Sequence, residues 1–192
     1  RDAARSSIGT TVPGVVMERL DTGGMGGPGP SQATVAAGLP TDADVWAAAA
    51  RIRPYVLETP VLTCRSFDEE LGAQLFFKCE NFQKVGAFKA RGACTAVLSL
   101  DAESAARGVI THSSGNHGAA VAYAAGIRGI PATVVMPEDA PVVKQESVAR
   151  YGAKVIRCPR PLRAQVCQEE IDRTGRPLVP PFAARNVVAG AG

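Results

Sequence analysis

Two hydrophobic periods alternate along the chain from residue 41 onward. Short apolar runs predict strands at 75–79, 108–112, 132–136 and 153–157. Amphipathic runs with a helical period predict helices at 41–52, 88–100, 117–127, 141–151 and 162–173. Strands separated by helices of this length are typical of βαβ units and parallel sheets. We therefore predict an α/β fold with mostly parallel sheets flanked by helices.

Residues 1–40 have a different composition. The stretch 21–30 reads Asp-Thr-Gly-Gly-Met-Gly-Gly-Pro-Gly-Pro, which can hold neither a helix nor a central strand. We predict that residues 1–40 form a disordered Gly/Pro-rich tail. At Thr41 the pattern changes, because a capping threonine followed by acidic residues is typical of a helix start.

Composition narrows the class of protein. The 192 residues carry 21 Lys+Arg and 18 Asp+Glu, and a net charge of +3 is too small to indicate nucleic-acid binding. No apolar run reaches the ~18 residues of a membrane helix, so no membrane partner is expected. The five cysteines form no CxxC pair or metal-binding spacing, which predicts free thiols in a reducing cytoplasm and no metal site. The cysteines are Cys64, Cys79, Cys94, Cys158 and Cys167.

The first candidate loop, residues 80–92, leads from a predicted strand into the helix that contains Lys89. A lysine in the first turn of a helix lies at the positive end of the helix dipole, which favours the neutral amine. A neutral amine is the nucleophile that a Schiff base requires. An ordinary solvated surface lysine remains the alternative.

The second candidate loop is Thr111-His-Ser-Ser-Gly-Asn-His-Gly118, which follows a predicted strand and opens a helix. Gly115 and Gly118 would let the backbone approach a ligand closely. The free N–H groups of the helix start would then bind a carboxylate or a phosphate, with Ser113, Ser114 and Asn116 adding polar side chains. A plain capping turn without a ligand stays an open alternative.

Together the two loops combine an amine nucleophile with an anion pocket, which favours amino-acid chemistry with pyridoxal phosphate. The sequence contains no GxxxxGK[ST] motif and no GxGxxG between a strand and a helix, so the common nucleotide-binding loops are excluded. A nucleophile elbow of the GxSxG type is also missing, which argues against a Ser-His-Asp hydrolase.

These residues resemble a known family. The stretch 76–93, Phe-Phe-Lys-Cys-Glu-Asn-Phe-Gln-Lys-Val-Gly-Ala-Phe-Lys-Ala-Arg-Gly-Ala, and the loop His112-Ser-Ser-Gly-Asn-His-Gly118 are similar to the serine racemase and serine/threonine dehydratase family. The likeness runs from about residue 54 to residue 192. It implies the fold type II architecture of pyridoxal-phosphate enzymes, with an incomplete large domain and a small domain. The implied parts are 41–107 and 181–192 of the large domain and a mobile small domain at 108–180.

The resemblance also implies roles for single residues. Lys89 would carry pyridoxal 5′-phosphate as a Schiff base and act as the base on one face, with Phe88 packed beside the cofactor ring. Asn116 would bind the 3′ oxygen of the cofactor, and Ser114 would be the acid/base on the opposite face. The substrate carboxylate would be held by Ser113, Ser114, Gly115, Asn116 and His117.

The implied reactions convert L-serine or L-threonine to pyruvate or 2-oxobutanoate plus ammonia, or racemise serine. Members of the family continue well beyond residue 192, so we expect a partial sequence whose full-length form is a cytoplasmic homodimer. Two alternatives stay open: a catalytically inactive truncated product that cannot hold the cofactor, and a cysteine synthase-like β-replacement enzyme.

Overall fold

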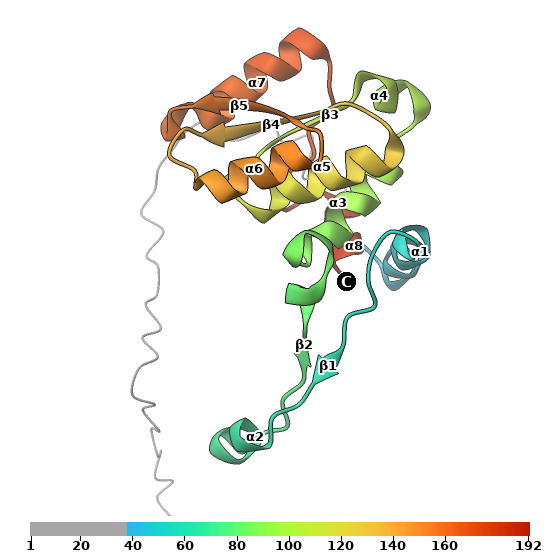
Figure 1. Ribbon diagram of the computed structural model, residues 1–192. Coiled ribbons are helices and arrows are strands. Elements are labelled where there is room, and N and C mark those ends of the chain that lie inside the picture. The colour runs from blue at the N-terminus through green and yellow to red at the C-terminus, as the bar shows by residue number, and fades with distance from the viewer. Residues whose placement is uncertain (1–37) are drawn as a thin grey trace, which may run out of the picture. The chain divides into compact units, whose positions relative to one another are not determined.

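Figure 1 shows the computed structural model, which describes residues 38–192. All of these residues belong to one compact unit, Gln32–Gly192. Its helices are α1 (Asp42–Ile52), α2 (Arg65–Leu71), α3 (Lys89–Leu98), α4 (Ala102–Arg107), α5 (Asn116–Arg128), α6 (Val142–Arg150), α7 (Arg163–Thr174) and α8 (Arg185–Ala191). Its strands are β1 (Val61–Leu62), β2 (Phe77–Lys78), β3 (Val109–His112), β4 (Ala132–Pro137) and β5 (Lys154–Cys158). Most of the predicted tail therefore lies outside the described residues.

A three-stranded parallel sheet in the order β3-β4-β5 organises residues 109–174. Helices α5 and α6 cover one face of this sheet and α7 covers the other (Figure 1). Each parallel connection needs a crossover, and the helices supply it, as the alternating sequence pattern predicted. The predicted α/β class is thus confirmed, and the carboxyl ends of the three strands share one edge of the sheet.

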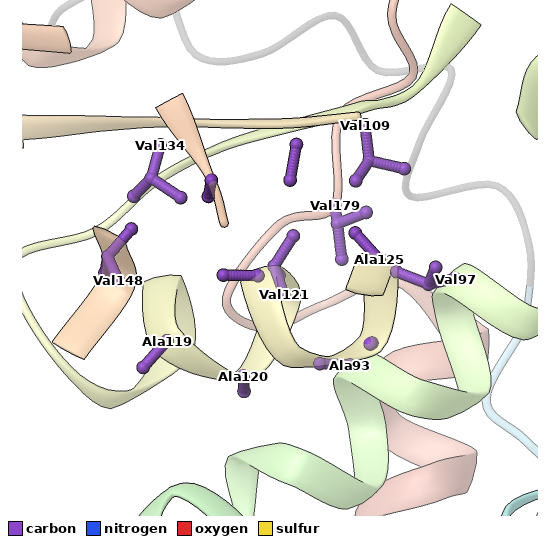
Figure 2. Close-up of a cluster of buried hydrophobic side chains, with 14 of the residues drawn as sticks. Ala93, Val97, Val109, Ala119, Ala120, Val121, Ala125, Val134, Val148 and Val179 are labelled. Carbon is purple, nitrogen blue, oxygen red and sulfur yellow. The ribbon is translucent and has the colours of Figure 1, made fainter. Parts of the chain in front are cut away.

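The core lies between the sheet and the α3–α5 layer. Figure 2 shows Val109 and Val134 of the sheet facing Val121 and Ala125 of α5. The side of α5 that meets α3 is lined with alanines, which keeps side chains short where two helices pack closely. These small side chains bring the first turn of α3 near the sheet edge from which α5 starts.

The strand predicted at 75–79 is the main correction. Only Phe77–Lys78 form a strand, and β2 pairs antiparallel with β1 rather than joining the parallel sheet. Phe77 and the preceding Phe76 are exposed, so these apolar side chains do not contribute to the sheet core. An isolated apolar run therefore gave the right element but the wrong partner, since periodicity does not determine strand pairing.

Three helices were not predicted: α2, α4 and α8. Each has only six or seven residues, too few for a clear amphipathic period. Helix α8 packs directly on α3, where a Cβ added at Gly92 would lie 2.6 Å from the carbonyl oxygen of Val187. Glycine is therefore required at this crossing. Among the described residues, no helix is both long and apolar enough to cross a membrane.

Candidate active site

Lys89 is the first residue of α3 and lies at the end of a tightly turned loop. Its Nζ donates a hydrogen bond to the carbonyl oxygen of Pro181 at 2.6 Å and lies 4.9 Å from the centre of the Phe88 ring. The lysine side chain is half-buried, whereas Phe88 is 45% exposed. The amine is thus held at a helix start next to an accessible aromatic face.

The backbone enters the left-handed region immediately before this helix. Val85 has φ 57° and Gly86 has φ 69°, and a β-branched residue rarely adopts such a conformation. Buried Gln83 holds the preceding turn: its Nε2 donates to the Leu57 carbonyl and its Oε1 accepts from the Leu57 N–H, each at 2.8 Å. The Val85 side chain packs against the core, which offsets the cost of the turn.

An ion pair closes the loop that carries Lys89. Arg91 Nε lies 2.8 Å from Glu80 Oε2, and Arg91 Nη2 lies 2.7 Å from Glu80 Oε1, which makes the pair bidentate. The Thr59 hydroxyl donates to Oε1 of the same carboxylate at 2.5 Å. The Arg91 hydrogen bond lowers the pKa of Glu80, against the effect of burial. The pair thus ties the end of β2 to the first turn of α3.

The second predicted loop follows β3 at the carboxyl edge of the sheet. Ser113 N–H continues the pairing by donating to the Val135 carbonyl at 3.0 Å, and the Ser113 hydroxyl accepts from Gly115 N–H at 3.2 Å. Helix α5 begins at Asn116, which is exposed, and no side chain caps it. The first N–H groups of a 13-residue helix are therefore available for an anion.

Gly118 explains how this helix start comes close to the sheet. A Cβ at this position would lie 2.8 Å from Val134 Cγ1. Only glycine lets the first turn of α5 rest directly on β4. The sequence predicted close approach to a ligand at this glycine, whereas the close contact found is with a side chain of the sheet.

His117 is buried and its Nε2 lies 3.0 Å from the carbonyl oxygen of Val179. A carbonyl can only accept, so Nε2 carries the hydrogen and the neutral ring leaves Nδ1 as an acceptor. The pKa of His117 is lowered to about 4, mainly by burial and to a smaller extent by the positive charge of Lys89. Nδ1 is buried without a hydrogen-bond partner in the described structure.

Residues 177–181 connect the two loops, a feature that sequence reasoning missed. Leu178 forms an isolated parallel β-bridge with Ile110, so this segment lies beside β3 and leaves the sheet at the same carboxyl edge. Its Val179 carbonyl binds His117 and its Pro181 carbonyl binds Lys89. A short Pro-Leu-Val-Pro-Pro run carries no periodic signal, so only the fold could reveal this role.

One cavity of the described structure lies away from these two loops. A volume of about 900 Å³ is lined by α1, by the Leu57–Glu58 segment and by the end of α8, rather than by Lys89 or the loop at 113–117. Within residues 38–192, no group of three or more His, Cys, Asp and Glu side chains could hold a metal ion. The groups available at this edge of the sheet are the Lys89 amine and the free N–H groups at the start of α5.

The fold is α/β, and one edge of its parallel sheet lies near both a lysine amine and a helix start with free N–H groups. The family model "Pyridoxal-phosphate dependent enzyme" matches residues 52–192. The chain belongs to this family, whose members depend on pyridoxal phosphate, and its fold is that of the fold type II enzymes, as predicted.

The similar proteins include racemases and ammonia-lyases. A serine racemase of Arabidopsis thaliana is 51% identical over 144 residues, which are 74% of this chain and 44% of that protein. An L-threo-3-hydroxyaspartate ammonia-lyase of Saccharomyces cerevisiae is 49% identical over 156 residues, 80% of this chain and 48% of that protein. The structure of maize serine racemase matches with a TM-score of 0.76 and 44% identity over 80% of this chain and 47% of that chain. The chain spans about half the length of the curated relatives it matches.

The described residues fit the aldehyde end of pyridoxal phosphate. Lys89 supplies a primary amine, the group that can bond to an aldehyde, and its Nζ lies 4.9 Å from the centre of the partly exposed Phe88 ring. Residues 177–181 also contact His117, which lies at an uncapped helix start whose N–H donors suit the oxygen anions of a cofactor or an amino acid.

Proposed function

We propose that this chain provides the lysine and the carboxylate-binding loop of a serine/threonine ammonia-lyase or serine racemase. The observation that carries the proposal is the shared attachment of Lys89 and His117 to the segment at 177–181. The relatives named as racemase and ammonia-lyase support it, because both reactions begin with loss of the Cα proton of a β-hydroxy amino acid.

The cofactor side of the site is assigned to three residues. Lys89 would hold pyridoxal phosphate through its amine, Phe88 would pack beside the ring, and Asn116 would bind an oxygen of the cofactor. When bound, the cofactor supplies an electron sink for the charge left at Cα. The Pro181 carbonyl would orient Lys89 Nζ in the free chain, since it occupies one of its donor hydrogens.

The substrate carboxylate would bind at the start of α5, in the loop Ser113–His117. Its donors are the free backbone N–H groups and the two serine hydroxyls. His117 would contribute its backbone N–H rather than its ring, because Nε2 is used by Val179 and Nδ1 accepts. The carboxylate would thus lie against the positive end of α5, which favours an anion without requiring a charged side chain.

Two atoms would move the Cα proton. Lys89 Nζ would take it on one face, and Ser114 Oγ would provide or accept a proton on the other. Elimination of the β-hydroxyl would need only the Lys89 amine, whereas racemisation would need both the Lys89 amine and the Ser114 hydroxyl. Replacing Ser114 should therefore affect racemisation and not elimination.

The experiment is a product assay on the purified chain loaded with pyridoxal phosphate. L-serine, L-threonine and L-threo-3-hydroxyaspartate are supplied, and 2-oxo acid, ammonia and the opposite enantiomer are measured. The proposal predicts at least one product, which Lys89→Ala abolishes, and loss of racemisation alone in Ser114→Ala. Turnover of O-acetylserine together with sulfide, supplied in a separate assay, would favour the β-replacement alternative. Turnover that Lys89→Ala leaves unchanged would contradict the proposal, whereas a chain without turnover on any substrate would support the inactive alternative.

Three further statements stay predictions from the family resemblance. These are that the full-length form is a homodimer, that it is cytoplasmic, and that the boundaries between the large and the small domain fall at residues 107/108 and 180/181. The free thiols found among the described residues are compatible with a reducing compartment.

A further inference from the structure

Lys144 reaches from α6 to the first residue of α5. Its Nζ donates to Asn116 Oδ1 at 2.6 Å, which joins the first turns of two neighbouring helices. The lysine side chain is half-buried and Asn116 is exposed. This contact lies beside the loop Ser113–His117, and sequence reasoning did not single out Lys144.

The bond determines which end of the Asn116 amide is available. An ammonium group has donors and no acceptor, so only the amide oxygen can face Lys144. The amide NH2 group, with two donor hydrogens, then points away from Lys144. We propose that Lys144 is a positioning residue that fixes this orientation, so that Asn116 presents a donor to an oxygen acceptor of the bound ligand. The inference rests on the proposed function, because it assigns the ligand to this edge of the sheet.

The location of Lys144 favours a role at the site over a role in its own helix. Lys144 lies in the first turn of α6, where the helix dipole disfavours a cation and acidic residues are preferred. Its ammonium group lies against the start of α5, which is also a positive helix end, and there it adds positive charge to the predicted anion pocket. A freely rotating Asn116 amide would offer its oxygen as often as its nitrogen, which would repel a carboxylate or a phenolic oxygen.

The test compares Lys144→Met with Lys144→Arg and with Arg150→Met, a matched control that removes an exposed cation from the same helix. The probe is pyridoxal 5′-phosphate. Borohydride reduction followed by peptide mass spectrometry gives the concentration of pyridoxal 5′-phosphate at which half of the Lys89 side chains are modified. Loss of a charge-assisted hydrogen bond predicts an increase of about tenfold in Lys144→Met. Lys144→Arg retains donors and should stay within about threefold of the parent, as should Arg150→Met.

A second measurement does not depend on cofactor binding. In the ¹⁵N–¹H spectrum, the side-chain amide signals of Asn116 should shift in Lys144→Met and stay in place in Arg150→Met. Unchanged Asn116 signals would overturn the inference, as would equal half-modification concentrations in Lys144→Met and the parent. If Lys89 of the parent is not modified at all, the proposed function fails, and the amide signals still decide whether Lys144 orients Asn116.

Discussion

Lys89 and His117 are bound to the same short stretch of backbone, at carbonyl groups two residues apart. Lys89 Nζ donates to Pro181 at 2.6 Å, and His117 Nε2 lies 3.0 Å from Val179. The lysine comes from α3 and the histidine from α5, two helices that pack against each other. The relative position of amine and anion pocket is therefore determined by helix packing and by residues 177–181 together.

The stability of the fold should depend on pH through His117. Its pKa falls from 6.5 to about 4 in the folded chain, so the unfolded state binds more protons between these values. Stability is complete above pH 6.5 and decreases as the pH falls toward 4. A shift of that size corresponds to about 3 kcal/mol. We expect urea unfolding at pH 7.5 and at pH 5.0 to differ by about 2 kcal/mol, with the protein more stable at pH 7.5.

His117→Gln is the control for this pH dependence, because the amide can still donate to the Val179 carbonyl and does not titrate. The variant should lose most of the difference between the two pH values. His112 has a pKa that burial also lowers, so a residual dependence of the same sign is expected. A full pH dependence in the variant would show that His117 is not the group responsible.

The Glu80–Arg91 pair should be needed to hold the Lys89 loop. Arg91→Ala leaves a mostly buried carboxylate without its bidentate partner, and we expect it to lower the free energy of unfolding by about 2–3 kcal/mol. Arg91→Lys keeps the charge without the bidentate geometry and should cost less. A double-mutant cycle with Glu80→Gln measures the coupling. Additive effects of the two substitutions would contradict a direct interaction.

Gly190 should be required where α8 crosses α3. A Cβ added there would lie 2.6 Å from Thr95 Cβ and 2.8 Å from the Arg91 carbonyl oxygen, so Gly190→Ala forces the two helices apart. We expect a loss of about 1–3 kcal/mol in thermal or urea unfolding. Gly126→Ala, in the exposed interior of α5 with its nearest contact at 3.7 Å, should instead stabilise by about 0.5–1 kcal/mol. Equal effects of both substitutions would argue against this packing.

Long amphipathic elements could be predicted from the sequence with small errors at their ends. The helix predicted at 117–127 is Asn116–Arg128, and the strand predicted at 132–136 is Ala132–Pro137. The position of Lys89 at a helix start could also be predicted, because a largely polar loop that contains Gly86 precedes it. These features are local, and local patterns determine them.

Contacts between distant segments could not be predicted in this way. The antiparallel pairing of β1 with β2 depends on two runs of two residues each. The attachment of His117 to Val179 spans 62 residues and uses a backbone carbonyl, which has no sequence signature. Lys144 carried a weak signal, a cation in the first turn of a helix, but its partner Asn116 is 28 residues away.

The most direct test of the account is covalent labelling of the chain by pyridoxal 5′-phosphate. After borohydride reduction, peptide mass spectrometry locates the modified lysine, with Lys84→Ala and Lys89→Ala as a matched pair from the same loop. The account predicts saturable modification of Lys89 that persists in Lys84→Ala and disappears in Lys89→Ala. Modification spread over the exposed lysines, with no preference for Lys89, would contradict it.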